Sequence, residues 1–237
     1  MQEPLVLLPG MMCDARLYAP QLADLTRDTA VMVAPITQGE RIEDIALELL
    51  TQLPAKFALA GLSMGGIVAM ELLRRAPERI TRIALMDTNP LAETPQSAAG
   101  YEPLISGARA GRLDEVMRQM IRPEYLAPGP ARIAAQNCIA EMARGLGPEV
   151  FVRQARALQR RRDQQATLRK CKCPALVLCG ELDGLTPVKR HTFMAELIPY
   201  AELQIIPDAG HLPVLEQPEA VNAALRAWMA QPVVQRG

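Results

Sequence analysis

The chain has 237 residues, 49% of them apolar, and its 26 basic side chains balance 26 acidic ones. This length is enough for one domain, or for one domain with an insertion, around a large core. A net charge of zero gives no electrostatic reason to expect a nucleic acid or an anionic membrane as a partner. The start of the chain has neither a basic n-region nor a long apolar run, so we expect no signal peptide and no membrane span.

Five cysteines are scattered along the chain, an odd number that indicates reduced thiols and predicts a cytoplasmic protein. The nearest two in sequence, Cys171 and Cys173, do not have the spacing of a zinc site, and the chain contains two histidines. We therefore expect no metal and no cofactor.

In the first 90 residues, short apolar runs alternate with helical patterns. The predicted strands cover residues 5–8, 30–36, 57–61 and 80–86. Between and after them, apolar residues at helical spacing predict helices that begin near residues 18, 42 and 66. Strict alternation of this kind predicts a parallel sheet that helices cover on both faces.

This alternation stops between residues 91 and 165, where no convincing strand occurs. Three apolar helical faces lie in this stretch, at 113–121, 135–146 and 151–158. The stretch is too small and too polar to be an independent domain. We interpret 91–165 as a helical cap on an α/β core formed by 1–90 and 166–237.

The strand–helix rhythm resumes with strands at 175–179 and 203–206 and with helices that begin near Pro187 and Pro218. Residues 231–237 are expected to form a loose tail. The predicted fold is therefore α/β, with a doubly wound sheet of about six parallel strands flanked by helices. The all-helical cap is inserted after the fourth strand.

One turn carries the strongest functional signal. Gly61-Leu62-Ser63-Met64-Gly65 lies between a predicted strand and a predicted helix and matches the G-x-S-x-G pattern of a nucleophile elbow. Such a turn holds a strained serine above the sheet, at the positive end of a helix. By composition, the match would arise by chance in roughly 1–2% of such chains. We expect Ser63 to be a catalytic nucleophile.

A serine nucleophile needs a general base, and histidine is the usual one. His211 follows the last predicted strand in a glycine-containing loop, which is where a base is needed. His191 lies inside a predicted helix, and we expect it to be structural.

The base in turn needs an acid, which in this architecture lies between the serine and the histidine in sequence. Asp183, in the loop after the fifth predicted strand, fits best. Glu181 and Asp208 are nearby competitors, and Asp87, after the fourth strand, is a rarer alternative position.

Acyl transfer also needs preorganised N–H donors for the oxyanion. We expect them from the backbone of Met64, directly after the nucleophile, and of Met11, in the loop after the first strand. Ser63, Asp183 and His211 all follow the carboxyl ends of predicted strands, and open α/β sheets bind their ligands at that edge.

With these motifs in view, nearly the whole chain resembles the α/β-hydrolase superfamily. The resemblance rests on the elbow at 61–66, the acid loop at 180–187, and Gly210-His211 with the later Glu216-Gln217-Pro218. It is nearer to compact capped esterases, enol-lactonases and related carbon–carbon hydrolases than to lipases. It implies a nucleophile at Ser63, an acid at Asp183, a base at His211 and a helical cap between the fourth and fifth strands.

The resemblance also implies a strand order of 2-1-3-4-5-6 in this chain's own count, with the family's leading antiparallel hairpin missing. Pro9-Gly10 stands where family members commonly carry His-Gly, which makes the oxyanion loop the least regular part of the match.

The predicted function is hydrolysis of a small-molecule ester, thioester or lactone through an acyl-enzyme on Ser63. Lyase or carbon–carbon hydrolase chemistry with the same triad is the alternative, and a non-catalytic ligand-binding module is a third possibility. The expected partner is a small-molecule substrate, while its identity and the oligomeric state stay open. Arg153, Arg156 and Arg160 share a helical face that could receive a carboxylate or a phosphopantetheine-like group, although such runs are more often solvated faces.

Overall fold

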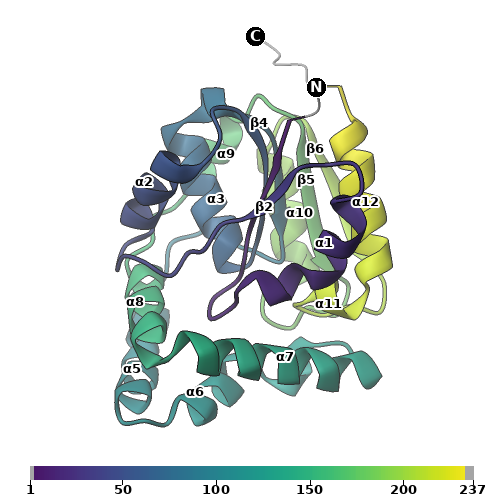
Figure 1. Ribbon diagram of the computed structural model, residues 1–237. Coiled ribbons are helices and arrows are strands. Elements are labelled where there is room, and N and C mark those ends of the chain that lie inside the picture. Colours follow the sequence, from purple (N-terminus) through teal and green to yellow (C-terminus); the bar gives the residue numbers. More distant parts are fainter. Residues whose placement is uncertain (1–2, 233–237) are drawn as a thin grey trace.

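A computed structural model describes residues 3–232, which form a sheet with helices on both faces (Figure 1). The six strands are β1 (Leu5–Leu8), β2 (Val31–Val33), β3 (Phe57–Leu62), β4 (Ile80–Met86), β5 (Ala175–Gly180) and β6 (Ala201–Ile206). Neighbouring strands are parallel throughout, in the order β2-β1-β3-β4-β5-β6. The predicted doubly wound sheet and its strand order are confirmed. The predicted tail over 231–237 lies, from 233 onward, outside the described residues.

Burial explains why the central strands are continuous apolar runs in the sequence. Every residue of β3, β4 and β5 is buried, because helices cover both faces of the parallel sheet. The edge strands β2 and β6 are partly exposed. β2 is shorter than the strand predicted over 30–36, since its ladder with β1 joins three residue pairs.

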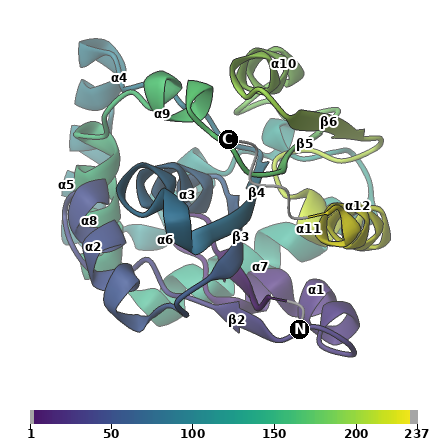
Figure 2. The same ribbon diagram turned by 90° about the horizontal axis from the view of Figure 1, so that it is seen from above.

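The helices form a layer on each side of the sheet (Figure 2). One face is covered by α2 (Ile42–Gln52), α3 (Met64–Arg75) and α10 (Val188–Leu197), and the other by α1 (Ala19–Leu25) and α12 (Pro218–Ala230). α2 buries Ile42, Ile45, Ala46 and Leu49, the i, i+3, i+4, i+7 stripe that the sequence predicts. Full burial of one such Ile or Leu contributes about 1.5–3 kcal/mol.

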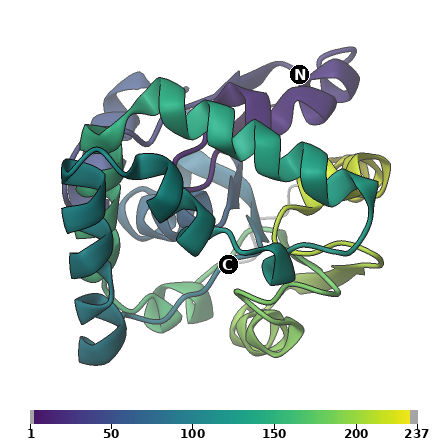
Figure 3. The same ribbon diagram turned by 90° about the horizontal axis from the view of Figure 1, so that it is seen from below.

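Between β4 and β5 the chain forms helices and no strand. The main ones are α4 (Pro95–Ala99), α5 (Tyr101–Arg109), α6 (Leu113–Met120), α7 (Pro130–Leu146) and α8 (Pro148–Gln159), which we call the cap. The cap lies across the carboxyl ends of the strands (Figures 1 and 3). The short α9 (Gln165–Arg169) instead packs beside α3 and α10. The predicted helical insertion is confirmed, and the domain boundaries at 91 and 165 stay a prediction.

The sequence did not predict α5, although this helix supplies part of the cap's core. Its buried residues are Ile105, Gly107 and Ala108, a short stripe in which two members carry little apolar surface. Gly107 allows a close approach, since a Cβ there would lie 2.9 Å from the Val116 side chain of α6. Within residues 3–232, no helix is both long and apolar enough to cross a bilayer.

Candidate active site

Ser63 occupies the sharp turn between β3 and α3. Its backbone has φ 54° and ψ −116°, a strained conformation that turns the side chain out of the strand. A Cβ on Gly61 would lie 2.3 Å from the Gly65 carbonyl oxygen, and one on Gly65 would lie 2.1 Å from the Leu8 carbonyl oxygen. Both flanking positions therefore require glycine, which explains the spacing of the motif.

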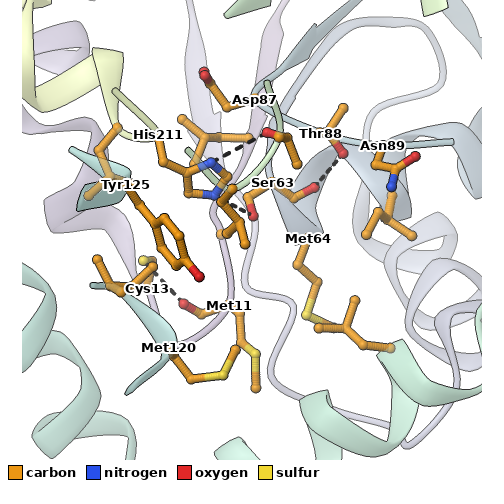
Figure 4. Close-up of a pocket in the computed structure, with 18 of the residues that line it drawn as sticks. Met11, Cys13, Ser63, Met64, Asp87, Thr88, Asn89, Met120, Tyr125 and His211 are labelled. Atoms are coloured by element: carbon orange, nitrogen blue, oxygen red, sulfur yellow. Dashed lines mark hydrogen bonds between the residues drawn. The ribbon is translucent and has the colours of Figure 1, made fainter. Parts of the chain in front are cut away.

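Ser63, His211 and Asp183 form a continuous chain of hydrogen bonds. His211 Nε2 lies 3.0 Å from Ser63 Oγ, and its Nδ1 lies 2.9 Å from Asp183 Oδ2 (Figure 4 draws the serine and the histidine). With the proton on Nδ1, the ring donates to the carboxylate and Nε2 is free to accept the serine proton. The three residues predicted from strand-end loops are thus together.

Asp183 is held as an anion by its surroundings. Its Oδ1 accepts from the backbone N–H groups of Leu185 (2.8 Å) and Thr186 (2.9 Å), and its Oδ2 accepts from the Thr186 hydroxyl. Burial raises the pKa of Asp183, but the neighbouring His211 and the hydrogen bonds from Thr186 outweigh burial and lower it to about 2. Asp183 is therefore ionised at neutral pH and can orient the histidine ring.

Asp87, the alternative acid, lies close behind but does not replace Asp183. Its Oδ1 accepts from the Gly180 N–H at 2.9 Å, and its buried Oδ2 has no hydrogen-bond partner within residues 3–232. Burial, followed by the charge of Asp183, raises the pKa of Asp87 well above its ordinary value of 3.8. The surroundings therefore shift the pKa values of the two carboxyl groups in opposite directions, with that of Asp183 lowered and that of Asp87 raised. The other competitors, Glu181 and Asp208, are exposed.

His191 is part of the scaffold behind the nucleophile. Its Nε2 accepts from the Thr88 N–H at 3.1 Å, and the Thr88 hydroxyl donates to the Ser63 carbonyl oxygen at 2.7 Å. Burial lowers the pKa of His191 to about 4, so the ring stays neutral at pH 7. This placement agrees with the structural role expected from the sequence.

The expected oxyanion donors belong to residues that line the same cavity. Met64 provides the first amide of α3, and the first amides of a helix have no intrahelical acceptor. Met11 follows β1, and both methionines line the cavity together with Ser63 (Figure 4). Backbone donors make no demand on the side chain, so methionine is acceptable at both positions.

A cavity of about 400 Å³ lies between the sheet and the cap and contains Ser63 and His211 in its wall. Its lining is largely apolar, with side chains from the cap helices facing the elbow. The apolar contributions include Ile67, Leu104, Met120, Ile121, Ile139 and Leu158. Such a cavity favours a substrate with an apolar chain.

Asp87, Asp183 and His211 also satisfy a distance test for metal ligands, since one ligand atom of each lies within 4.8 Å of the others. Asp183 already uses both oxygens, and His211 uses Nδ1 toward Asp183 and Nε2 toward Ser63. The cluster is accounted for as a hydrogen-bonded acid–base pair, with the Asp87 carboxyl group bound to the Gly180 N–H behind it. The expectation of no metal and no cofactor stays a prediction.

The model of the alpha/beta hydrolase family matches residues 5–224. The chain belongs to the alpha/beta hydrolase family. It is 27% identical over 201 residues to the pimeloyl-[acyl-carrier protein] methyl ester esterase of Aromatoleum aromaticum, covering 77% of each chain. It is 26% identical over 231 residues to a putative carbamate hydrolase of Pseudomonas savastanoi pv. phaseolicola, covering 90% of this chain and 88% of that one.

Solved structures agree with this assignment. A thermophilic esterase from Thermogutta terrifontis superimposes with a TM-score of 0.86 at 27% identity, covering 96% of this chain and 89% of the other. The enol-lactonase of Burkholderia xenovorans LB400 superimposes with a TM-score of 0.84 at 21% identity, covering 98% of this chain and 93% of the other. The second likeness extends to the fold alone.

Two buried side chains whose contacts the sequence did not predict hold the loops of this hydrolase in place. Gln154 of α8 accepts from the Met12 N–H at 2.9 Å and donates to the Ile36 carbonyl oxygen at 3.0 Å. It thereby fixes the loop that carries Met11. No motif marks this residue, because its role depends on where the cap lies.

Glu216 is the second, and it ties the histidine loop to the cap. Its Oε2 accepts from the N–H groups of Ala127 (2.7 Å) and Gly210 (2.9 Å), and its Oε1 accepts from Leu212 N–H at 2.9 Å. Two of these donors flank His211, so the carboxylate fixes the backbone on both sides of the base. Glu216-Gln217-Pro218 marks the position in the sequence but not the contacts.

The three arginines predicted as substrate contacts do not line the cavity of the hydrolase. Arg153 donates to the Thr37 carbonyl oxygen, Arg156 pairs with Glu102, and Arg160 lies 3.8 Å from Glu40. Arg161 does line it, because α8 ends at Gln159 and the chain turns inward beyond that residue. Helical spacing does not apply beyond Gln159, so the helical face predicted from the sequence could not show that Arg161 lines the cavity.

Proposed function

We propose that this hydrolase cleaves a small-molecule ester, thioester or lactone through an acyl-enzyme on Ser63. One observation carries the proposal. The distances of 3.0 Å from Ser63 Oγ to His211 Nε2 and 2.9 Å from His211 Nδ1 to Asp183 Oδ2 join nucleophile, base and acid at the wall of an apolar cavity. The relatives and solved structures named as esterases support the ester class.

The geometry suits a two-step acyl transfer. Ser63 Oγ attacks the carbonyl carbon while its proton passes to His211 Nε2, and the N–H groups of Met11 and Met64 stabilise the oxyanion. The tetrahedral intermediate expels the alcohol, thiol or lactone oxygen, which takes the proton from His211. Water then attacks the acyl-enzyme, His211 accepts its proton, and collapse releases the acid and returns the proton to Ser63. Ionised Asp183 stabilises the charged ring in both steps.

A fluorophosphonate probe tests this proposal, because it reacts with an activated serine. We expect the wild-type protein to be labelled and Ser63→Ala to be spared. Ser106→Ala is the matched control, since Ser106 is exposed on α5 and should leave labelling unchanged. Equal labelling of Ser63→Ala would remove Ser63 from its role. Labelling without turnover of any ester, thioester or lactone would favour carbon–carbon bond cleavage instead.

Two further predictions concern the partner and the location of the protein. A small-molecule substrate fits a cavity of about 400 Å³. A cytoplasmic location stays a prediction from the five scattered cysteines, which are free thiols.

A further inference from the structure

A largely buried ion pair lies in the wall of this cavity. Arg161 Nη2 lies 2.8 Å from Glu93 Oε1, and the two side chains are 10% and 11% exposed. Both residues line the same cavity as Ser63. Glu93 lies two residues before α4 and Arg161 two residues after α8, so the pair belongs to the part of the cavity wall beside these helices. α11 (Pro213–Glu216), which follows the His211 loop, lies on the other side of the sheet in Figure 2.

Both carboxylate oxygens of Glu93 have a partner, whereas the Arg161 guanidinium has more N–H donors than this ion pair uses. Glu93 Oε1 faces Arg161, and Oε2 accepts from the Ser97 hydroxyl at 2.5 Å. A guanidinium offers five N–H donors, and the Arg161 side chain lines the cavity. Its Nε has no hydrogen-bond partner within residues 3–232 but is enclosed by protein, so a ligand would reach the Nη groups instead. An oxygen with a free lone pair would be stabilised beside these donors, because hydrogen bonds from charged groups are stronger than those between neutral groups.

Charge limits what that acceptor can be. Glu93 already balances Arg161, and the neighbouring cavity wall contains Leu104, Leu158 and the largely buried Tyr101. Burial, and then the charge of Glu93, raises the pKa of Tyr101 to about 12, so this side chain stays neutral. A ligand carboxylate would add a third, uncompensated charge to a poorly hydrated site. An uncharged oxygen would accept from an Nη N–H of Arg161 at no such cost.

We propose that Arg161, charge-balanced by Glu93, is a specificity-determining contact for an uncharged hydrogen-bond acceptor, such as a ketone, amide or hydroxyl oxygen, at the end of the substrate remote from the scissile ester. This inference rests on the proposed esterase function and deepens it. The substrate then has an ester at Ser63, an apolar chain along the cavity and a neutral polar end at Arg161.

Methyl esters test the proposal, because their alcohol part is small and the acyl chain of the substrate is then the only group long enough to fill the cavity. At each of several chain lengths, three esters are compared that end in a methyl group, a methyl ketone or a carboxylate. In the wild-type protein, we expect kcat/KM for the ketone to exceed that for the methyl-terminated ester by about tenfold to a hundredfold at the matching length. This range corresponds to a hydrogen bond with a charged donor. The carboxylate should give no comparable gain.

Variants of Arg161 and Glu93 test whether this ion pair causes the preference for the ketone. Arg161→Met should abolish the ketone preference, and the double variant Arg161→Met/Glu93→Gln should do the same without leaving a buried unpaired carboxylate. Glu93→Gln, which leaves Arg161 uncompensated, should shift the preference toward the carboxylate ester. Arg162→Met is the matched control, since Arg162 is exposed, pairs with Glu43 and should keep the wild-type ratio. Turnover of methyl acetate should be unchanged in the Arg162→Met control.

Failure of this inference is distinct from failure of the esterase function. A ketone preference that survives Arg161→Met, or a wild-type preference for the carboxylate, would overturn the role of Arg161 while ester turnover continued. If no ester is turned over, a long-chain alkyl ketone without an ester can be tested as a competitor of fluorophosphonate labelling. Protection of the wild type and not of Arg161→Met would support the subsite, and equal protection would overturn it.

Discussion

Gln154 Oε1 accepts a hydrogen bond from the Met12 backbone N–H at 2.9 Å, which joins the cap to the loop that bears an oxyanion donor. Gln154 is fully buried, and its amide also donates to Ile36 at the end of the β2 loop. The cap of this hydrolase therefore does more than cover the cavity. It sets the conformation of a loop in which Pro9-Gly10 precedes Met11 and in which Met12 has a positive φ of 56°.

Gln154→Leu should lower kcat by about tenfold, less than the loss of an oxyanion donor itself, because Met11 keeps its N–H but loses its fixed position. Leaving the Met12 N–H buried without an acceptor should also cost about 1–3 kcal/mol of unfolding free energy. Steady-state kinetics and urea unfolding measure the two effects. Gln159→Leu on the same helix is the control, since Gln159 contacts other cap residues. Wild-type kcat in Gln154→Leu would refute the coupling.

Glu216→Gln should loosen the histidine loop. The variant keeps the size of the side chain but replaces one acceptor oxygen by an NH2 group, which would face the N–H donors of Leu212 or of Ala127 and Gly210. We expect a loss of about 3 kcal/mol in unfolding free energy, as for charged hydrogen bonds, together with a lower kcat. Glu219→Gln, at an exposed position in the first turn of α12, should change neither quantity. Equal stability of the Glu216 and Glu219 variants would contradict this account.

Asp183→Asn should lower kcat by about 10³- to 10⁴-fold, because the amide cannot hold the proton on Nδ1 or stabilise the charged ring. Asp87 should not rescue the variant, since Asp87 hydrogen-bonds Gly180 and not His211. Asp208→Asn tests the exposed competitor and should retain full activity. A larger loss in Asp208→Asn than in Asp183→Asn would reverse the assignment.

Asp87→Asn should change the pH dependence of stability. The pKa of Asp87 is raised in the folded protein above its ordinary value of 3.8, so above that pH the unfolded chain releases a proton that the folded protein keeps. Wild-type stability should therefore fall relative to Asp87→Asn as pH rises, by up to about 1.4 kcal/mol per pH unit while folded Asp87 stays protonated. Urea unfolding of both proteins between pH 4.5 and 7.5 measures the difference. A pH-independent difference would mean that Asp87 is ionised in the folded state.

Local signals in the sequence predicted the parallel sheet and the residues at the strand ends, while the strand order followed from the resemblance to the α/β-hydrolase superfamily. The elbow needs glycine at Gly61 and Gly65 for steric reasons, and parallel strands bring Asp183 and His211 to the same edge. The contacts of Gln154 and Arg161 could not be predicted, because they depend on how the cap packs on the core. The sequence placed Arg153, Arg156 and Arg160 on one helical face. In the structure these side chains contact the core and other cap residues and do not line the cavity.

The acyl-enzyme on Ser63 is the central claim, and rapid-quench mass spectrometry of the protein during ester turnover tests it most directly. Under acid quench in the first turnovers, the peptide that contains Ser63 should gain the mass of the acyl group, and the adduct should decay as acid is released. His211→Ala should show neither the adduct nor turnover. Steady ester hydrolysis by the wild-type protein with no adduct at any time, and with undiminished activity in Ser63→Ala, would contradict the account.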